Sequence, residues 1–295
     1  MPKFQKRKRR KQPQKCIFCG APNVTKEHIW PRWTHYYMLP RQRKVRHGLI
    51  AKAYLDRTEY EVVKLRHQMR DWQVKCVCGG DHHTCNNGWM REKLENPAKL
   101  IMLPLIKGEA VRITPSAQTI IAGWAALKSM VAEYDQYGSV TVHHMQRKHL
   151  RLFQRPPDNG WGIWIGYFER KKSEGDWWSR PLLIIPDKQL QKLRTREATH
   201  SNSCATTQII GKLFIHVIHC PMPGIIRRWR WPRQCRGSLF RIWPPSSYSI
   251  DWPGTPIIDG EAELIADAFA NFALEVGRRQ EGLSSSVRFS KVPLF

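Results

Sequence analysis

The stretch CIFCGAPNVTKEHIWP, residues 16–31, decides how the first part of the chain should fold. It opens with a C-x-x-C turn in which Cys16 and Cys19 can share one zinc ion, and Gly20 permits the chain reversal. After the turn, residues 24–30 favour a short strand. The stretch therefore predicts a metal-stapled turn that leads directly into a strand.

A second group of possible zinc ligands lies near residue 80. A tetrahedral structural zinc needs two ligands besides the first pair, and Cys85 is the third ligand. We predict His82 as the fourth, because the stretch HHTC that begins there repeats the spacing of the first knuckle. Cys78 and Cys76 are the alternatives to His82. Clustered cysteines with this spacing indicate a metal site rather than a disulfide framework.

Between and after the knuckles, the sequence predicts two further elements. Residues 73–78 alternate polar and apolar side chains, as a strand does. Asn86 or Asn87 can cap a helix that runs through Glu95 and ends at Pro97. The order is therefore strand, strand, helix, with a long insertion between the two strands.

Together these motifs resemble the HNH family of His-Me finger nucleases. The resemblance covers about residues 15–96: a knuckle, an acidic residue directly before a histidine, a proline, and a second knuckle that ends in Cys-Asn. It implies a ββα-metal module, in which zinc staples the outside and a catalytic metal lies inside. By the same correspondence, His28 is the general base, and Glu27 and Asn86 bind magnesium or another divalent cation.

The chemistry of phosphodiester cleavage explains these residue types. Histidine titrates near neutrality and suits a base, while carboxylate and amide oxygens are hard ligands that suit magnesium. Glu27 and His28 would point to opposite sides of a regular strand, so a bend is needed for both to serve one site. The sequence departs from the family where Glu27 replaces the commoner Asp, and where Met90 stands in place of a further histidine.

The charge of the chain indicates a polyanionic partner. The formal net charge is +25, with 49 Lys and Arg against 24 Asp and Glu. Nucleic acid is the first expectation, DNA ahead of RNA, with an anionic membrane surface or ribosomal packing as alternatives. A basic and aromatic stretch could grip phosphates and stack on bases; its residues are Arg227, Arg228, Trp229, Arg230, Trp231 and Arg233. The alternative is a surface loop whose tryptophans pack on the C-terminal domain.

The fold class expected is α+β, in three parts. Residues 1–14 read as a disordered basic arm, 15–96 as the HNH module, and 97–295 as a basic α+β accessory domain of unknown fold. In the last part we expect a helix after Thr114, strands at 161–168, 181–186 and 207–219, and a helix at 261–276. No apolar run nears the roughly 20 residues of a membrane helix, and no secretory signal is seen, so a cytoplasmic location is expected.

The sequence thus predicts a metal-dependent endonuclease that hydrolyses nucleic-acid phosphodiester bonds, with structural zinc and catalytic magnesium or another divalent cation. Two alternatives stay open. One is a zinc-finger protein that binds nucleic acid without catalysis, and the other is an HNH nuclease that acts on RNA.

Overall fold

The computed structural model describes the chain as a mixture of helices and strands, an α+β fold. The described residues are 13–38, 46–53, 58–65, 71–80, 84–135, 140–169, 176–186, 201–222, 224–279, 283–287 and 290–291. The expected basic arm lies outside these ranges except for its last two residues.

A two-stranded antiparallel sheet and a helix form the N-terminal unit. Strand β1 (Val24–His28) pairs with β4 (Gln73–Cys78). A π-helix (Asn86–Glu95) follows and continues directly into helix α1 (Asn96–Lys107). Pro97, expected to end the helix, instead lies in the first turn of α1, directly after the junction with the π-helix. The expected domain boundary at 96/97 thus falls inside a continuous helical run.

The insertion between β1 and β4 joins a different sheet. It contains a 3-10 helix (Arg32–Tyr37), and strands β2 (Arg46–Ala53) and β3 (Thr58–Leu65), which pair with each other. Strand β14 (Ser290–Lys291) links β2 to the large sheet of the chain.

The large sheet has the strand order β10-β6-β9-β8-β7-β14-β2-β3, and its neighbours along this path are antiparallel. Short strands β12 and β13 pair with β6 and β7. The remaining strands of this sheet are β6 (Trp161–Phe168), β7 (Asp176–Pro186), β8 (Ser203–Ile210), β9 (Leu213–His219), β10 (Phe240–Trp243), β12 (Pro256–Ile257) and β13 (Leu283–Val287). The single strand expected at 207–219 is a hairpin, because Gly211 and Lys212 form a two-residue turn between β8 and β9.

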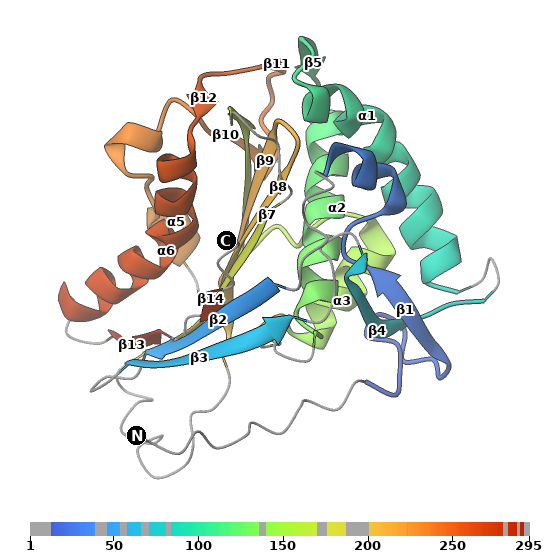
Figure 1. Ribbon diagram of the computed structural model, residues 1–295, viewed down its shortest axis with the longest axis horizontal. Helices are drawn as coiled ribbons and strands as arrows, with labels where there is room; N and C mark the ends of the chain where they lie inside the picture. Colours follow the sequence, from blue (N-terminus) through green and yellow to red (C-terminus); the bar gives the residue numbers. More distant parts are fainter. Residues whose placement is uncertain are drawn as a thin grey trace.

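Helices cover both faces of the central strands (Figure 1). Helix α2 (Pro115–Ala132), capped by Thr114, packs on one face, and α6 (Asp259–Arg279) packs on the other. In β6 the side chains alternate: Ile163 and Ile165 join the core with α2, whereas Trp164 joins the core with α6. Burial of both faces explains why almost every residue of β6, β8 and β9 is buried, polar ones included.

The N-terminal unit lies on the outer side of α2, where β4 contacts this helix (Figure 1). One hydrophobic core includes cysteines and aromatic residues of the N-terminal unit together with α1, α2 and one face of the large sheet. Among the remaining elements are α3 (His144–Phe153), α5 (Ile225–Arg228), and the pair β5 (Val111–Ile113) and β11 (Ile250–Trp252). Within the described part of the chain, no helix is both long and apolar enough to cross a bilayer.

Candidate metal centre and catalytic site

The first knuckle is a hydrogen-bonded turn held against β4. The backbone N–H of Cys16 donates to the carbonyl of Ala21 at 2.8 Å, and that of Gly20 donates to the carbonyl of Cys16 at 2.9 Å. Gly20 has a φ of 76°, a left-handed conformation that glycine adopts without steric cost. The N–H of Ile17 donates to the carbonyl of Cys76 at 3.0 Å. The turn therefore presents its two cysteines beside β4.

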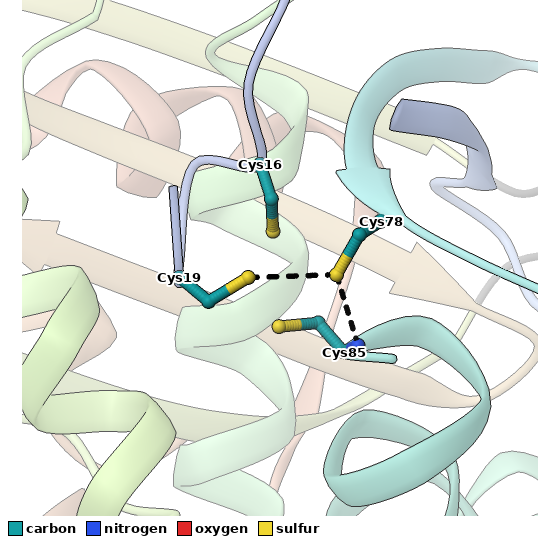
Figure 2. Close-up of side chains that lie close together, drawn as sticks. All are labelled: Cys16, Cys19, Cys78 and Cys85. Carbon is teal, nitrogen blue, oxygen red and sulfur yellow. Dashed lines mark hydrogen bonds between the residues drawn. The ribbon is translucent and has the colours of Figure 1, made fainter. Parts of the chain in front are cut away.

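Four cysteine side chains point toward one another at the end of the β1–β4 pair (Figure 2). The sulfur atoms of Cys16, Cys19, Cys78 and Cys85 all lie within 4.8 Å of one another. The sulfurs of Cys19 and Cys78 are 3.5 Å apart, and the backbone N–H of Cys85 donates to the sulfur of Cys78 at 3.2 Å. Tetrahedral zinc with Zn–S bonds of about 2.3 Å needs sulfur–sulfur distances of about 3.8 Å. The four cysteines could therefore bind a metal ion such as zinc.

Three thiols of this cluster have shifted pKa values. The hydrogen bond between Cys16 and Cys85 lowers the pKa of Cys16 to about 4 and raises the pKa of Cys85. Burial raises the pKa of Cys78 to about 11. Negative charge is thus confined largely to one sulfur, because thiolates this close repel one another unless a cation lies between them. A divalent cation would favour the thiolate form of all four ligands.

A bulge in β4 brings Cys78, rather than Cys76, into this group of four. The pairing of β1 with β4 shifts register between Thr25 and Lys26, so that Cys76 is an extra residue in β4. The bulge breaks the alternation that would otherwise point both cysteines to the same side. His82, the preferred fourth ligand from the spacing, lies outside the described residues. In the described part of the chain, Cys78 completes the group.

The carboxylate of Glu27 is buried between β1 and helix α2. Its Oε1 accepts a hydrogen bond from Nζ of Lys128 at 2.7 Å, and the side chain of Lys128 is entirely buried. Burial raises the pKa of Glu27 above its ordinary value, although the charge of Lys128 and a hydrogen bond from the side chain of Asn86 oppose the rise. Glu27 on the strand and Asn86 on the helix therefore lie together, although they are far apart in the sequence.

Lys128 has two further oxygen partners. Its Nζ donates to the backbone carbonyl of His28 at 3.0 Å and lies 3.5 Å from Oε2 of Glu95. Burial alone would lower the pKa of Lys128, but the charges of Glu27 and Glu95 raise it overall. Lys128 therefore stays charged and joins α2 to β1 and to the end of the π-helix.

His28 is half buried at the end of β1, opposite Gln73 in β4. The side-chain amide of Gln73 donates to Nε2 of His28 at 2.7 Å. An amide N–H can only donate, so Nε2 carries a lone pair and the proton of the neutral ring lies on Nδ1. Burial, followed by the nearby charges of His35 and Arg32, lowers the pKa of His28. The ring is therefore mostly neutral at pH 7, as a general base must be.

Asn86 is the first residue of the π-helix and does not cap it. Cys85 occupies the N-cap position, without a side-chain hydrogen bond to the helix. The neighbouring Asn87 donates instead to the carbonyl of Gly80 at 3.3 Å. Of the two asparagines considered from the sequence, Asn86 is thus the one whose amide contacts Glu27.

Comparisons of the chain with family models, curated proteins and solved structures gave no match. The resemblance to the HNH family therefore depends on the residues of the two knuckles, on Glu27 and His28, and on Asn86. Any function has to be inferred from the chemistry of this site.

The basic and aromatic stretch at residues 227–233 divides into exposed arginines and buried tryptophans. Trp229 packs edge-on against Phe269 of α6, and Trp231 packs edge-on against Trp164 of β6. These indoles form part of the core and cannot also stack on bases, in agreement with the alternative of a loop that packs on the C-terminal part. The exposed arginines are Arg227, Arg228, Arg230 and Arg233, and Arg230 donates to the backbone carbonyls of Arg227 and Trp229.

Sequence reasoning missed three residues of this site, Lys128, Glu95 and Gln73, and the first of them carries a signal. Lys128 lies at a position where helical spacing predicts a buried face, and a lysine there is itself unusual enough to indicate a specific partner. Glu95 and Gln73 resemble ordinary surface residues of a helix and a strand. Their role depends on the pairing of β1 with β4 and on the packing of α2.

Proposed function

We propose that this chain is a metal-dependent endonuclease that hydrolyses phosphodiester bonds of nucleic acid, with DNA as the first substrate to test. The observation that carries the proposal is the contact of Asn86 with the carboxylate of Glu27, the residue that precedes His28 in β1. The cysteine cluster lies at the opposite end of β4 from the residue that contacts His28. The cysteine cluster and the candidate catalytic site therefore lie at opposite ends of the β1–β4 pair.

His28 would act as the base that takes a proton from the attacking water. Its Nε2 lone pair is the acceptor of the Gln73 hydrogen bond, so a water molecule has to replace Gln73 as the donor. The contact with Gln73 fixes the ring orientation until this exchange occurs. The lowered pKa of His28 keeps Nε2 unprotonated near neutral pH.

The side chains of Glu27 and Asn86 offer oxygen ligands that suit a hard divalent cation. A carboxylate oxygen of Glu27 and the amide oxygen of Asn86 would hold magnesium, which prefers oxygen ligands. When bound, the cation would stabilise the charge that develops on the phosphate. The exposed arginines at residues 227–233 would bind phosphates elsewhere on the same strand or duplex.

The ion pair inside the site favours a second candidate function. Lys128 already neutralises Glu27 at 2.7 Å, so this carboxylate has a structural partner that requires no metal. A protein with the same cysteine staple and positive charge could bind nucleic acid without cutting it. The two functions differ in whether turnover depends on magnesium.

Magnesium-dependent cleavage tests the proposed function. Full-length, zinc-loaded protein should convert supercoiled plasmid to nicked or linear products only after magnesium is added, and removal of magnesium by dialysis should stop the reaction. Single-stranded DNA and RNA of the same sequence should be assayed in parallel, to identify the preferred substrate. Tight binding with no cleavage of any of the three would contradict the nuclease and favour the non-catalytic binder.

Binding should weaken steeply with salt, because the charge of +25 implies many phosphate contacts. Each contact on duplex DNA should contribute about −0.9 to the slope of log affinity against log salt. Fluorescence anisotropy with a labelled duplex, read without magnesium at several salt concentrations, measures this slope. An affinity that does not change with salt would contradict a polyanionic partner.

A further inference from the structure

Lys128 is a fully buried cation at the centre of the candidate catalytic site. Its ammonium group lies 2.7 Å from Oε1 of Glu27, 3.0 Å from the carbonyl oxygen of His28 and 3.5 Å from Oε2 of Glu95. These three oxygens match the three N–H donors of an ammonium group. Burial of such a charge is tolerated only when it is paired and hydrogen-bonded.

The nearest of these oxygens belongs to Glu27, the residue that would hold a divalent cation. Glu27 accepts from Lys128 and, through its carboxylate, contacts Asn86. A divalent ion at Glu27 and the ammonium of Lys128 would repel each other, because both would lie within a few ångströms of one carboxylate. The side chain of Lys128 is entirely buried and that of Glu27 nearly so, which leaves this repulsion poorly screened by water.

We propose that Lys128 is a resident cation that competes with the divalent metal for Glu27, and that it thereby sets the metal concentration the site requires. This inference rests on the proposed function, because it takes Glu27 as the metal ligand. Lys128 acts through Glu27 and is a positioning residue rather than a catalytic one.

Glu95 moderates this competition. It is the second carboxylate beside the ammonium and is less buried than Glu27, with a side chain 23% exposed. Two carboxylates and one ammonium leave a single negative charge in the cluster. Loss of the ammonium would leave two, which suits a divalent cation, whereas loss of the Glu95 charge would leave none.

Metal binding without any substrate tests the inference. Full-length, zinc-loaded protein is titrated with Mn²⁺, and the free ion is measured by electron paramagnetic resonance. We expect Lys128→Met to bind Mn²⁺ at least about tenfold more tightly than the unchanged protein, because the competing charge is gone. Lys107→Met is the matched control, since Lys107 pairs with Glu109 at the surface, and it should leave the affinity unchanged.

A second variant keeps the inference testable if Lys128→Met does not fold. Glu95→Gln removes a charge from a partly exposed side chain and leaves Glu27 as the one carboxylate that pairs with Lys128. We expect it to bind Mn²⁺ several-fold more weakly. A folded Lys128→Met protein with unchanged or weaker affinity would overturn the inference, and so would an unchanged affinity in Glu95→Gln.

This outcome is separable from the failure of the proposed function, because no cleavage enters the measurement. If the Mn²⁺ affinities shift as expected and no nucleic acid is cut, the cation competition holds and the nuclease does not. If magnesium-dependent cleavage is found and the affinities do not shift, the nuclease holds and Lys128 is only a structural ion-pair partner.

Discussion

Replacement of Cys16 or Cys85 by Ser should remove the zinc and unfold the N-terminal unit, rather than merely slow a reaction. A structural zinc site contributes about 10–16 kcal/mol of apparent binding free energy, which is comparable to the 5–15 kcal/mol that stabilises a typical domain. The cysteine cluster also belongs to the same hydrophobic core as α1 and α2. Loss of the zinc should therefore destabilise these helices as well as the two knuckles. Elemental analysis should find about one zinc per unchanged chain and little in either variant.

A matched control separates zinc loss from the general cost of a buried serine. Cys220 is buried, lies outside the cluster and forms a hydrogen bond with Ser203 that a serine can retain. Cys220→Ser should keep its zinc and lose only about 1–3 kcal/mol in urea unfolding. Unchanged protein that is folded and soluble but free of zinc would contradict the zinc assignment.

The fourth ligand can be identified by the same measurement. Cys78 completes the group of four sulfurs, so Cys78→Ser should lose zinc as Cys85→Ser does. His82→Ala should then keep its zinc. If Cys78→Ser keeps its zinc and His82→Ala loses it, His82 is the fourth ligand, as the spacing in the sequence predicts.

Spacing in the sequence predicts much of the metal cluster but cannot choose its last member. Cys16, Cys19 and Cys85 follow from the two knuckles, and the structure brings them together. The choice between Cys78 and its neighbours depends on the bulge at Cys76, which is a property of the β1–β4 pairing. Local propensity does not determine a bulge, because an extra residue is accommodated only when the partner strand is in place.

The helices expected after Thr114 and at 261–276 and the strand expected at 161–168 correspond to α2, α6 and β6. Helix α2 begins after Thr114 as expected. The side-chain oxygen of Thr114 accepts a hydrogen bond from the N–H of Ala117. The run at 207–219 predicts one strand although it forms two, because both faces of β8 and β9 are buried and the apolar run shows no break between them. Gly211, with a φ of 55°, was the available signal for the hairpin.

The ion pair between Glu27 and Lys128 could not be read from the sequence, because it joins a strand and a helix that meet only in the folded chain. It also changes how the site should be probed. Glu27→Ala would remove the nearest carboxylate from a buried ammonium, at a cost of up to about 3–5 kcal/mol. Asn86→Ala is the cleaner probe of metal binding, since Asn86 is partly exposed and carries no charge.

Replacement of His28 by Ala should lower the rate of cleavage by about 10²–10⁴-fold, the usual contribution of a general base, and leave substrate affinity nearly unchanged. The fold should survive, because His28 is only half buried and its side chain lies outside the cysteine cluster. His144→Ala is the matched control: this histidine is exposed on α3, so the rate should stay within a few-fold of the unchanged protein.

The cleavage rate of the unchanged protein should depend on pH through the titration of His28. Burial and neighbouring positive charges lower the pKa of His28 from its ordinary value of 6.5. Only the neutral ring accepts a proton, so the rate should rise with pH and level off, with the midpoint of the acid limb below 6.5. A limb centred clearly above 6.5 would assign the titration to another group.

The most direct measurement is the single-turnover rate of plasmid nicking by unchanged and His28→Ala proteins, both folded, zinc-loaded and saturated with magnesium. The proposed mechanism predicts that the His28→Ala rate falls by at least about a hundredfold while both proteins bind the plasmid with the same affinity. Equal nicking rates would remove His28 from catalysis and favour a zinc-stapled protein that binds nucleic acid without cutting it.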